Sequence, residues 1–311
     1  MTLKGKVVFS SGQSGDYDIF VLDLGNKVIQ QLTSGKYFND CPKWSPDGKR
    51  IVFISDRTGF AEIWMMNEDG AQQEQITKSE KWHNTPDWSP DGNELVFSAN
   101  YDGNVDIFAM DLRKRGLTQI TDYKEMDFTP QFSPKGDKII FASKRSGNND
   151  IWLYDRQSKK MVQLTKYGGR DYAPAFSSDG KYIAYVTEEV DRQGRSNLDI
   201  FVMTPEGKDL KKITWNRGTD RYVGWSPDGE YLIYTSDQGG AGERLCVNKF
   251  DVSHFQLSKS QPLSYSREAL EKETGARPKA TMLFQLLPES IVRQTYPKDH
   301  FGTERFPDWK Y

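Results

Sequence analysis

The sequence predicts an all-β fold, a six-bladed β-propeller, from a repeated motif, short strand-like runs between its copies, and a matching C-terminal fragment. The motif Trp-Ser-Pro-Asp-Gly begins at Trp44, Trp88 and Trp225, and it recurs in altered form at Phe132 and Phe176. These five aromatic anchors are separated by 44, 44, 44 and 49 residues. A repeat of this length is typical of one four-stranded propeller blade.

Each repeat contains four short strand-like runs. In the repeat anchored at Trp44, the first run leads into the anchor, residues 51–54 and 62–66 form the next two, and residues 75–77 form the fourth. Gly, Asp and Pro separate the runs, and the Pro-Asp-Gly triplet has the residues of a tight turn. The pattern therefore predicts four-stranded antiparallel blades.

An acidic residue opens the third strand of every blade. It follows the anchor by 18 residues in the second, third, fourth and sixth blades. In the fifth blade the interval is 23, and the five extra residues lie in the loop 188–198. These acids are Asp18, Glu62, Asp106, Asp150, Asp199 and Glu243. We expect them to be structural, because all six blades have one, and to cap turns or pair with residues such as Arg57 and Arg145.

The first blade lacks one strand at the N-terminus, and the C-terminus supplies a match. Residues 306–309 resemble residues 85–88, so we expect the C-terminal strand 306–311 to complete the first blade beside residues 7–10. Such closure removes the open edges of a linear array. The whole chain, 1–311, is therefore predicted to be a single β-propeller domain.

The last blade has an insertion of approximately 40 residues, about 251–295. The interval from Glu243 to Trp309 is 66 residues where 26 is usual, and it contains a helix-like stretch at 266–273. The outer strand of this blade is either 256–264 or 291–295, and the sequence does not choose between them. A degenerate seventh blade is a further alternative, although no anchor motif supports it.

Composition excludes several classes of protein. With 42 basic and 44 acidic residues the net charge is −2, which gives no basic field for nucleic acid. No apolar run approaches the roughly 18 residues of a membrane span, so no membrane insertion is expected. Cys41 and Cys246 are predicted to be buried free thiols. Because a strand pattern begins at residue 6, either Met1 starts a cytoplasmic protein or a leader has been removed.

The repeat resembles that of TolB-type β-propellers, which also occurs in the propeller domains of dipeptidyl-peptidase and prolyl-oligopeptidase relatives. The matching features are Trp/Phe-Ser-Pro-Asp-Gly, the apolar strand after it, the acid-Ile-Trp/Phe strand and Gln-Leu/Ile-Thr, over residues 5–250 and 306–311. The chain has no room for the α/β domain that precedes the TolB propeller, and it lacks a Gly-x-Ser-x-Gly elbow. The resemblance implies a propeller module and a location in the bacterial periplasm or cell envelope.

The candidate site is a ring of polar residues at one mouth of the central channel. The loops before the anchor strands and before the acid-Ile strands fall on one face, which we call the top face; the Pro-Asp-Gly turns fall on the other. The ring consists of the residues five and four positions before each anchor: Asn39, Asp40, His83, Asn84, Asp127, Phe128, Asp171, Tyr172, Asp220, Arg221, Glu304 and Arg305.

Two interpretations of this ring remain open. Its carboxylates suit a divalent cation such as calcium, or a basic or amide-rich segment of a partner; alternatively, Asp and Asn hold the turn into the strand. Aromatic residues on the same loops suit a protein-binding or sugar-binding surface, or else packing between blade ends. They are Tyr37, Phe38, Trp82, Phe128, Tyr172, Trp215 and Tyr222.

Two functions are therefore carried forward. The first is a monomeric, non-enzymatic binding or scaffold propeller that takes a protein or peptide partner on its top face and needs no cofactor. The second is a carbohydrate-active propeller, a lyase or hydrolase, that uses the acids and His83 with a bound metal. No catalytic residue can be assigned from the sequence. The absence of a cofactor motif and of a His cluster favours the first.

Overall fold

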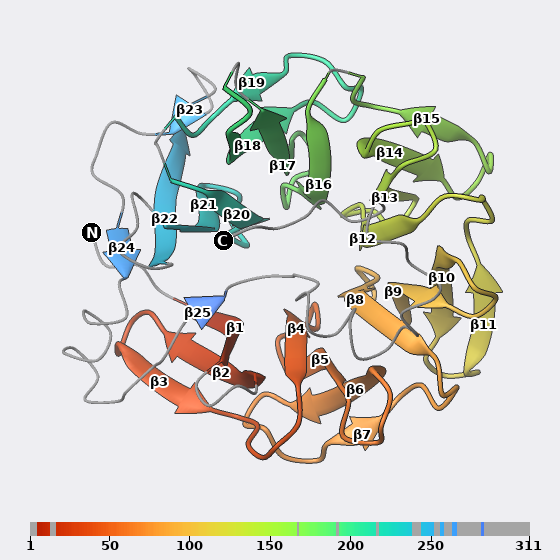
Figure 1. Cartoon of the computed structure of the whole chain (residues 1–311). Coiled ribbons are helices and arrows are strands. Elements are labelled where there is room, and N and C mark those ends of the chain that lie inside the picture. Colours follow the sequence, from red (N-terminus) through yellow and green to blue (C-terminus); the bar gives the residue numbers. More distant parts are fainter. Residues whose placement is uncertain are drawn as a thin grey trace.

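Six β-sheets are arranged around a central axis in the computed structural model (Figure 1), which confirms the predicted six-bladed propeller. The structure describes residues 5–12, 17–166, 168–190, 193–215, 218–237, 244–251, 256–257, 263–265 and 281–282. All regular elements in these ranges are β-strands, and every pairing within a sheet is antiparallel.

The first three blades come from the N-terminal half of the chain. Blade 1 contains β1 (Lys6–Gly12), β2 (Tyr17–Asp23) and β3 (Val28–Gln31). Blade 2 contains β4 (Asn39–Trp44), β5 (Arg50–Ser55), β6 (Glu62–Asn67) and β7 (Glu74–Gln75). Blade 3 contains β8 (Trp82–Trp88), β9 (Glu94–Asn100), β10 (Val105–Asp111) and β11 (Gly116–Gln119).

The other three blades follow the same order. Blade 4 contains β12 (Asp127–Phe132), β13 (Lys138–Ser143), β14 (Asp150–Asp155) and β15 (Met161–Gln163). Blade 5 contains β16 (Arg170–Phe176), β17 (Ile183–Val190), β18 (Ser196–Met203) and β19 (Lys211–Lys212). Blade 6 contains β20 (Asp220–Trp225), β21 (Tyr231–Ser236), β22 (Arg244–Asp251), β23 (Gln256–Leu257) and β24 (Leu263–Tyr265).

The repeated motif forms the turn between the first two strands of a blade. In blade 2 the Ser45 hydroxyl donates to Asp47 at 2.6 Å and accepts from the Arg50 amide at 2.9 Å. Gly48 follows in the left-handed region with φ 68°, which glycine adopts without steric cost. The motif is thus a bottom-face turn whose local chemistry fixes the register of β4 on β5.

Each innermost strand of blades 2 to 6 contains a β-bulge that the sequence did not predict. The pairing with the second strand shifts between Asp40 and Lys43 in blade 2, and equivalently in the other four. One non-glycine residue in each bulge has a φ between 45° and 55°: Cys41, Thr85, Thr129, Ala173 and Tyr222. Bulges increase local twist, so each innermost strand turns sharply beside the channel.

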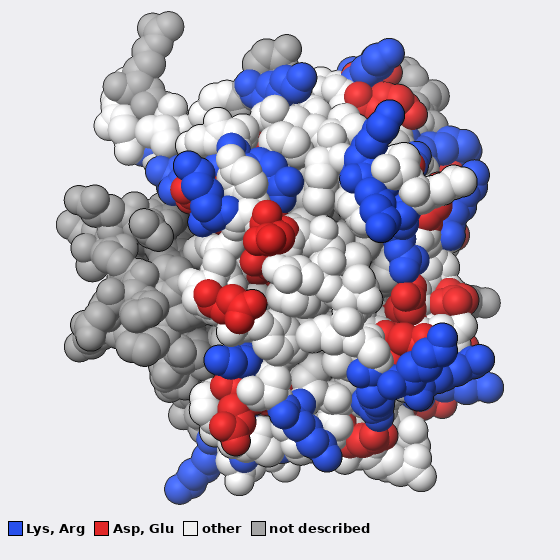
Figure 2. Space-filling view, turned by 90° about the vertical axis from the view of Figure 1, so that its right-hand side faces the viewer, with Lys and Arg blue, Asp and Glu red and all other residues white. Residues whose placement is uncertain are grey.

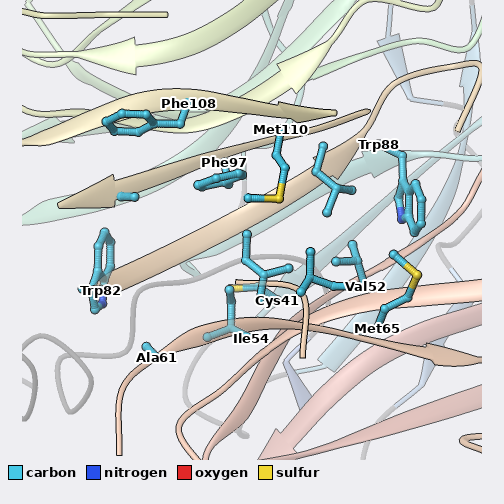
Figure 3. Packing of buried hydrophobic residues seen from close by; sticks show 14 of the residues in the cluster. Cys41, Val52, Ile54, Ala61, Met65, Trp82, Trp88, Phe97, Phe108 and Met110 are labelled. Carbon is cyan, nitrogen blue, oxygen red and sulfur yellow. The ribbon is translucent and has the colours of Figure 1, made fainter. Parts of the chain in front are cut away.

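The hydrophobic core lies between neighbouring blades. Figure 3 shows one such interface, where Val52 and Met65 of blade 2 face Trp88 and Phe97 of blade 3. The indole of the anchor Trp88 is 5% exposed, and its Nε1 donates to the Lys43 carbonyl at 3.2 Å. Burial of such a ring contributes roughly 1.5–3 kcal/mol, so the anchors join the blades, as expected.

Blade 1 receives its fourth strand from the C-terminal part of the chain. β25 (Thr281–Met282) pairs with Ser10 and Ser11 of β1. The strand predicted at 306–311 lies outside the described residues, as do the helix-like stretch 266–273 and the alternative strand 291–295. In blade 6, β23 and β24 both pair with β22, so segments within 256–265 supply its outer edge.

The remaining features agree with the composition. Cys41 and Cys246 are buried free thiols, as predicted. Figure 2 shows basic and acidic side chains interspersed over the outer side of the ring, in keeping with the net charge of −2. Within the described ranges, the chain has no helix with the length and hydrophobicity of a membrane span.

Candidate functional site

The predicted ring residues occupy the first positions of the innermost strands, where the chain enters each blade from the top face. Ten of the twelve lie within the described ranges; Glu304 and Arg305 do not. Eight of the ten are buried: Asn39, Asp40, His83, Asn84, Asp127, Phe128, Asp171 and Asp220. Tyr172 and Arg221 are half-buried. Most of the ring therefore lies in the wall of the propeller, where it joins one blade to the next.

Asn39 links blade 1 to blade 2. Its Nδ2 donates to Asp18 of blade 1 at 3.2 Å, and its Oδ1 accepts from Nη2 of Arg57 at 2.9 Å. Arg57 lies in the β5–β6 connection of the same blade. The amide is thus held between an acid on one side and a guanidinium on the other, which suits its ability to donate and accept together.

His83 has the same position between blades 2 and 3. Its Nδ1 lies 3.0 Å from the Lys81 carbonyl and 3.2 Å from Glu62, and its Nε2 lies 2.9 Å from the Tyr101 hydroxyl. Since Nδ1 faces acceptors, it carries the proton, and Nε2 accepts from Tyr101. Burial lowers the pKa of His83. The ring is therefore neutral and bonded at both nitrogens.

Asp127 pairs with a guanidinium in blade 4. Nη2 of Arg145 lies 2.6 Å from Asp127 Oδ2, and the carboxyl side chain is 0% exposed. Burial raises the pKa of Asp127, although Ser143 and Arg145 oppose the shift. Burial also raises the pKa of Asp106, the acid that opens the third strand of blade 3, to about 6.

Five of the six acids that open the third strands lie within the described residues. Arg57 interacts electrostatically with Asp18, but its guanidinium donates to Asn39 and Ser55, and that of Arg145 donates to Asp127 and Ser143. In four blades the acid instead accepts from the threonine that follows the outer strand of its own blade, as Asp18 does from Thr33 at 3.0 Å. The same threonine oxygen accepts from the backbone amide of Ile19 at 2.8 Å. Equivalent threonine–acid bonds join Thr77 to Glu62, Thr121 to Asp106, and Thr214 to Asp199.

The second residues of the pairs in blades 2, 3 and 5 also contact the preceding blade. Asp40 accepts from the Ser10 hydroxyl, and burial raises its pKa to about 6. Asn84 accepts from the Cys41 thiol at 3.0 Å, while its Nδ2 has no partner among the described residues. The rings of Phe128 and Tyr172 lie 6.2 Å apart.

Blade 5 differs, because its ring residue borders a cavity. Asp171 accepts from the Thr187 hydroxyl at 2.8 Å and is 3% exposed. A cavity of about 290 Å³ lies beside it, between blades 4 and 5. Burial raises the pKa of Asp171 to about 7, and the nearby charges of Asp150 and Glu189 act in the same direction.

The aromatic residues divide into two groups. Tyr37 and Trp215, on the connections into β4 and β20, are 45% and 76% exposed. Two residues that the sequence analysis missed, Phe60 and Tyr123, are also exposed and lie on top-face connections. The remaining predicted aromatics are buried or half-buried and pack between blade ends: Phe38, Trp82, Phe128, Tyr172 and Tyr222.

No metal-ligand group is formed within the described ranges, where no three His, Cys, Asp or Glu side chains come together in the way a metal ion needs. Glu304, one of the five carboxylates of the predicted ring, lies outside these ranges. The divalent cation therefore stays a prediction.

The chain is thus a six-bladed propeller whose blades are joined by polar contacts. Each of the first five repeats contains an acid-Ile-aromatic strand. The family model for the TolB beta propeller domain matches residues 4–88 and 71–197. The chain belongs to this family.

Solved structures give the same assignment. TolB from Acinetobacter baumannii is 25% identical with a TM-score of 0.69, over 84% of this chain and 65% of that one. A putative TolB from Agrobacterium tumefaciens is 21% identical with a TM-score of 0.57, over 67% and 80%. An oligogalacturonate lyase in complex with manganese is 13% identical with a TM-score of 0.57, over 85% and 75%. The last two show a shared fold. A search of curated protein sequences finds no significant match.

Proposed function

We propose that this propeller is a binding module that takes a protein or peptide segment on its top face. The observation that carries the proposal is the set of exposed aromatic side chains on the loops that enter the innermost strands, above all Trp215 and Tyr37. Aromatic side chains dominate the binding energy of protein interfaces. Covering an indole as exposed as that of Trp215 contributes up to about 3 kcal/mol.

The family assignment supports this proposal, because the chain is similar to TolB over most of its length. The carbohydrate-active alternative has less support. His83, the base it would use, is 0% exposed and is bonded at both ring nitrogens. The likeness to the oligogalacturonate lyase, at 13% identity, extends to the fold.

A peptide-display selection tests the proposal. Peptides selected on the wild-type protein are titrated against the double variant Tyr37→Ser, Trp215→Ser. We expect at least about tenfold weaker binding, since buried aromatic anchors commonly contribute more than 1 kcal/mol each. The control is Leu117→Ser, because Leu117 is exposed to a similar extent as Tyr37 but lies on the outer strand β11.

Three outcomes would contradict the proposal. The first is the absence of enriched peptides, and the second is binding that Leu117→Ser weakens as much as the double variant does. The third is turnover of oligogalacturonate in the presence of manganese, which would favour the enzymatic alternative. Far-ultraviolet circular dichroism of both variants checks that the fold is intact.

A further inference from the structure

Blades 2 to 5 have one equivalent position that is occupied differently in each. The position lies close to the end of the second strand of the blade. The residues that occupy it follow one another at intervals of 44: Arg57, Tyr101, Arg145 and Glu189. In each blade this residue follows the first ring residue of the same blade by 18 positions. In blades 2 and 4 the space that its side chain fills lies between that ring residue and two aromatic rings.

In blade 2 this space contains a guanidinium, and we call it the arginine slot. Its walls are Asn39, Phe53, Ser55 and Trp64. The Arg57 guanidinium carbon lies 5.5 Å from the Phe53 ring centre and 4.5 Å from that of Trp64. Its nitrogens donate to Ser55 at 2.9 Å and to Asn39 at 2.9 Å. The slot thus combines an aromatic wall with polar acceptors.

Blade 4 repeats the arrangement with a full ion pair. The Arg145 guanidinium lies 5.2 Å from the Phe141 ring centre and 5.1 Å from that of Trp152. It donates to Ser143 at 2.8 Å and to the buried carboxylate of Asp127 at 2.6 Å. Stacking over aromatic rings and a fork of donors to a carboxylate are features of arginine that lysine does not share.

Blade 3 fills the same space with a neutral ring. The phenol of Tyr101 packs edge-to-face on Phe108, with centroids 4.7 Å apart, and its hydroxyl bonds to His83 at 2.9 Å. The position is therefore occupied in blades 2, 3 and 4. The equivalent residues of blades 1 and 6 lie outside the described ranges.

In blade 5 the slot keeps its walls and loses its occupant. The cavity of about 290 Å³ is lined by Asp171, Tyr185, Thr187 and Phe201, which are the counterparts of Asn39, Phe53, Ser55 and Trp64. The rings of Tyr185 and Phe201 lie 5.9 Å apart. Glu189, which also borders the cavity, takes the place of the arginine.

The local chain path explains why the slot is empty. In blade 2 the second strand ends at Ser55, and the next residues turn so that Arg57 folds back over the rings. In blade 5 the second strand continues to Val190, where it pairs with Ser196 of the extended third strand. Glu189 is therefore held on a strand, paired with Asn197, at the rim of the cavity.

Apart from a tyrosine phenol, the ionisable groups in the lining of the cavity are both carboxyl groups. Asp171 and Glu189 line it, and Asp199 shares the ammonium of Lys212 with Glu189. One ammonium, that of Lys212, lies 2.6 Å from Glu189 and 2.7 Å from Asp199. No ion pair that the described residues form reaches Asp171, whereas its counterpart Asp127 is paired with Arg145. A cation that enters the cavity would meet a buried carboxyl without a positive partner.

We propose that the blade 5 cavity binds the guanidinium of an arginine side chain in the segment that docks on the top face. This rests on the proposed function and names one side chain of the partner. Blade 4 shows the geometry that such a guanidinium would adopt: stacked on the aromatic rings and paired with the carboxyl. Trp215, whose ring centre lies 5.1 Å from the Lys212 ammonium, places the exposed aromatic surface next to the cavity.

The test compares three short probes by ligand-detected nuclear magnetic resonance titration. They are the acetylated and amidated tripeptides Gly-Arg-Gly, Gly-citrulline-Gly and Gly-Lys-Gly. Citrulline keeps the shape of arginine without its charge, and lysine keeps the charge without the planar fork. We expect the arginine probe to bind at least about tenfold more tightly than either, as bidentate, stacked sites discriminate between these groups.

Two variants locate the binding in the cavity. Asp171→Asn removes the carboxylate, and Glu189→Arg supplies an internal guanidinium in the position that Arg57 and Arg145 hold elsewhere. Both variants should bind the arginine probe at least about tenfold more weakly than the wild type does. The filled variant, Glu189→Arg, should also unfold at a higher temperature than the wild type, so loss of binding in it cannot come from misfolding. Glu206→Arg makes the same charge change on an exposed connection of blade 5 and should leave binding unaltered.

Several results would overturn the inference. They are equal affinity for the arginine and citrulline probes, arginine binding that survives in Glu189→Arg or Asp171→Asn, or an equal loss in Glu206→Arg. The proposed function has a separate outcome. Selected peptides that need Tyr37 and Trp215 but bind equally well with citrulline at their arginines would support top-face binding and refute the arginine slot as its subsite.

Discussion

Replacing Asp171 by asparagine changes how the stability of the propeller depends on pH. The pKa of Asp171 is raised from 3.8 to about 7 by burial, so the folded state keeps a proton that the unfolded chain releases near pH 4. Between these values the unfolded chain binds fewer protons, and stability therefore falls as pH rises. The amide of the Asp171→Asn variant would be neutral throughout and would not contribute this loss.

The size of the effect follows from the two pKa values. At about 1.36 kcal/mol per pKa unit, the carboxyl of Asp171 destabilises the wild type by roughly 2.5 kcal/mol more at pH 8 than at pH 5. Any fixed cost of fitting an amide beside Thr187 is the same at both pH values. The stability of Asp171→Asn relative to the wild type should thus rise by about 2.5 kcal/mol between pH 5 and pH 8.

Urea unfolding of both proteins at pH 5 and pH 8 measures this difference. The control is Asp155→Asn. Because the Ser158 amide and hydroxyl lower the pKa of the exposed Asp155, that carboxyl is ionised at both pH values and its removal should give no such change. A relative stability of Asp171→Asn that varies by less than about 0.5 kcal/mol would refute the buried, uncompensated carboxyl on which this reasoning depends.

Two further predictions concern the buried polar contacts of the ring residues. Arg145→Met leaves the buried Asp127 without its ion pair and should cost about 3–5 kcal/mol in thermal or urea unfolding. Arg115→Met, at an exposed pair with Glu74, should cost less than about 1 kcal/mol; equal costs would contradict this expectation. His83→Gln should destabilise by about 1–3 kcal/mol at pH 7. Burial lowers the pKa of His83, so below pH 6.5 the unfolded wild type binds a proton that the folded wild type does not. The stability difference between the wild type and His83→Gln should therefore shrink by pH 5, and a constant difference would argue against a neutral ring.

The fold could be predicted because its signal is local and repeated. Ser45, Asp47 and Gly48 bond within one turn, and five copies of that turn mark five blades without any long-range information. Closure was harder to predict. The first blade does receive a strand from the C-terminal part of the chain, but the described one is Thr281–Met282, and no anchor motif marks it.

The sequence indicated where the innermost strands begin but not the environment of their first residues. Counting back from the anchors located the top ends of the innermost strands correctly. It could not show that residues such as His83 are buried, because their partners lie 18 residues further along the chain. Nor could it show the bulges, since their left-handed positions hold residues such as Cys41 and Thr129 and not glycine. Aligning the repeats at positions 57 and 189 would have revealed the charge reversal in blade 5.

The longer hairpin of blade 5 has a consequence for how a partner is oriented. A ring of six equal blades would offer a docking segment six rotational settings of equal energy. Selecting one of the six costs about 1 kcal/mol of binding free energy. Among blades 2 to 5, blade 5 has the longest second and third strands, β17 and β18. They lie beside a cavity whose counterpart is filled by a side chain in the other three blades. Among blades 2 to 5, blade 5 thereby departs from the pseudo-symmetry, and a setting that uses it becomes distinguishable from the other three.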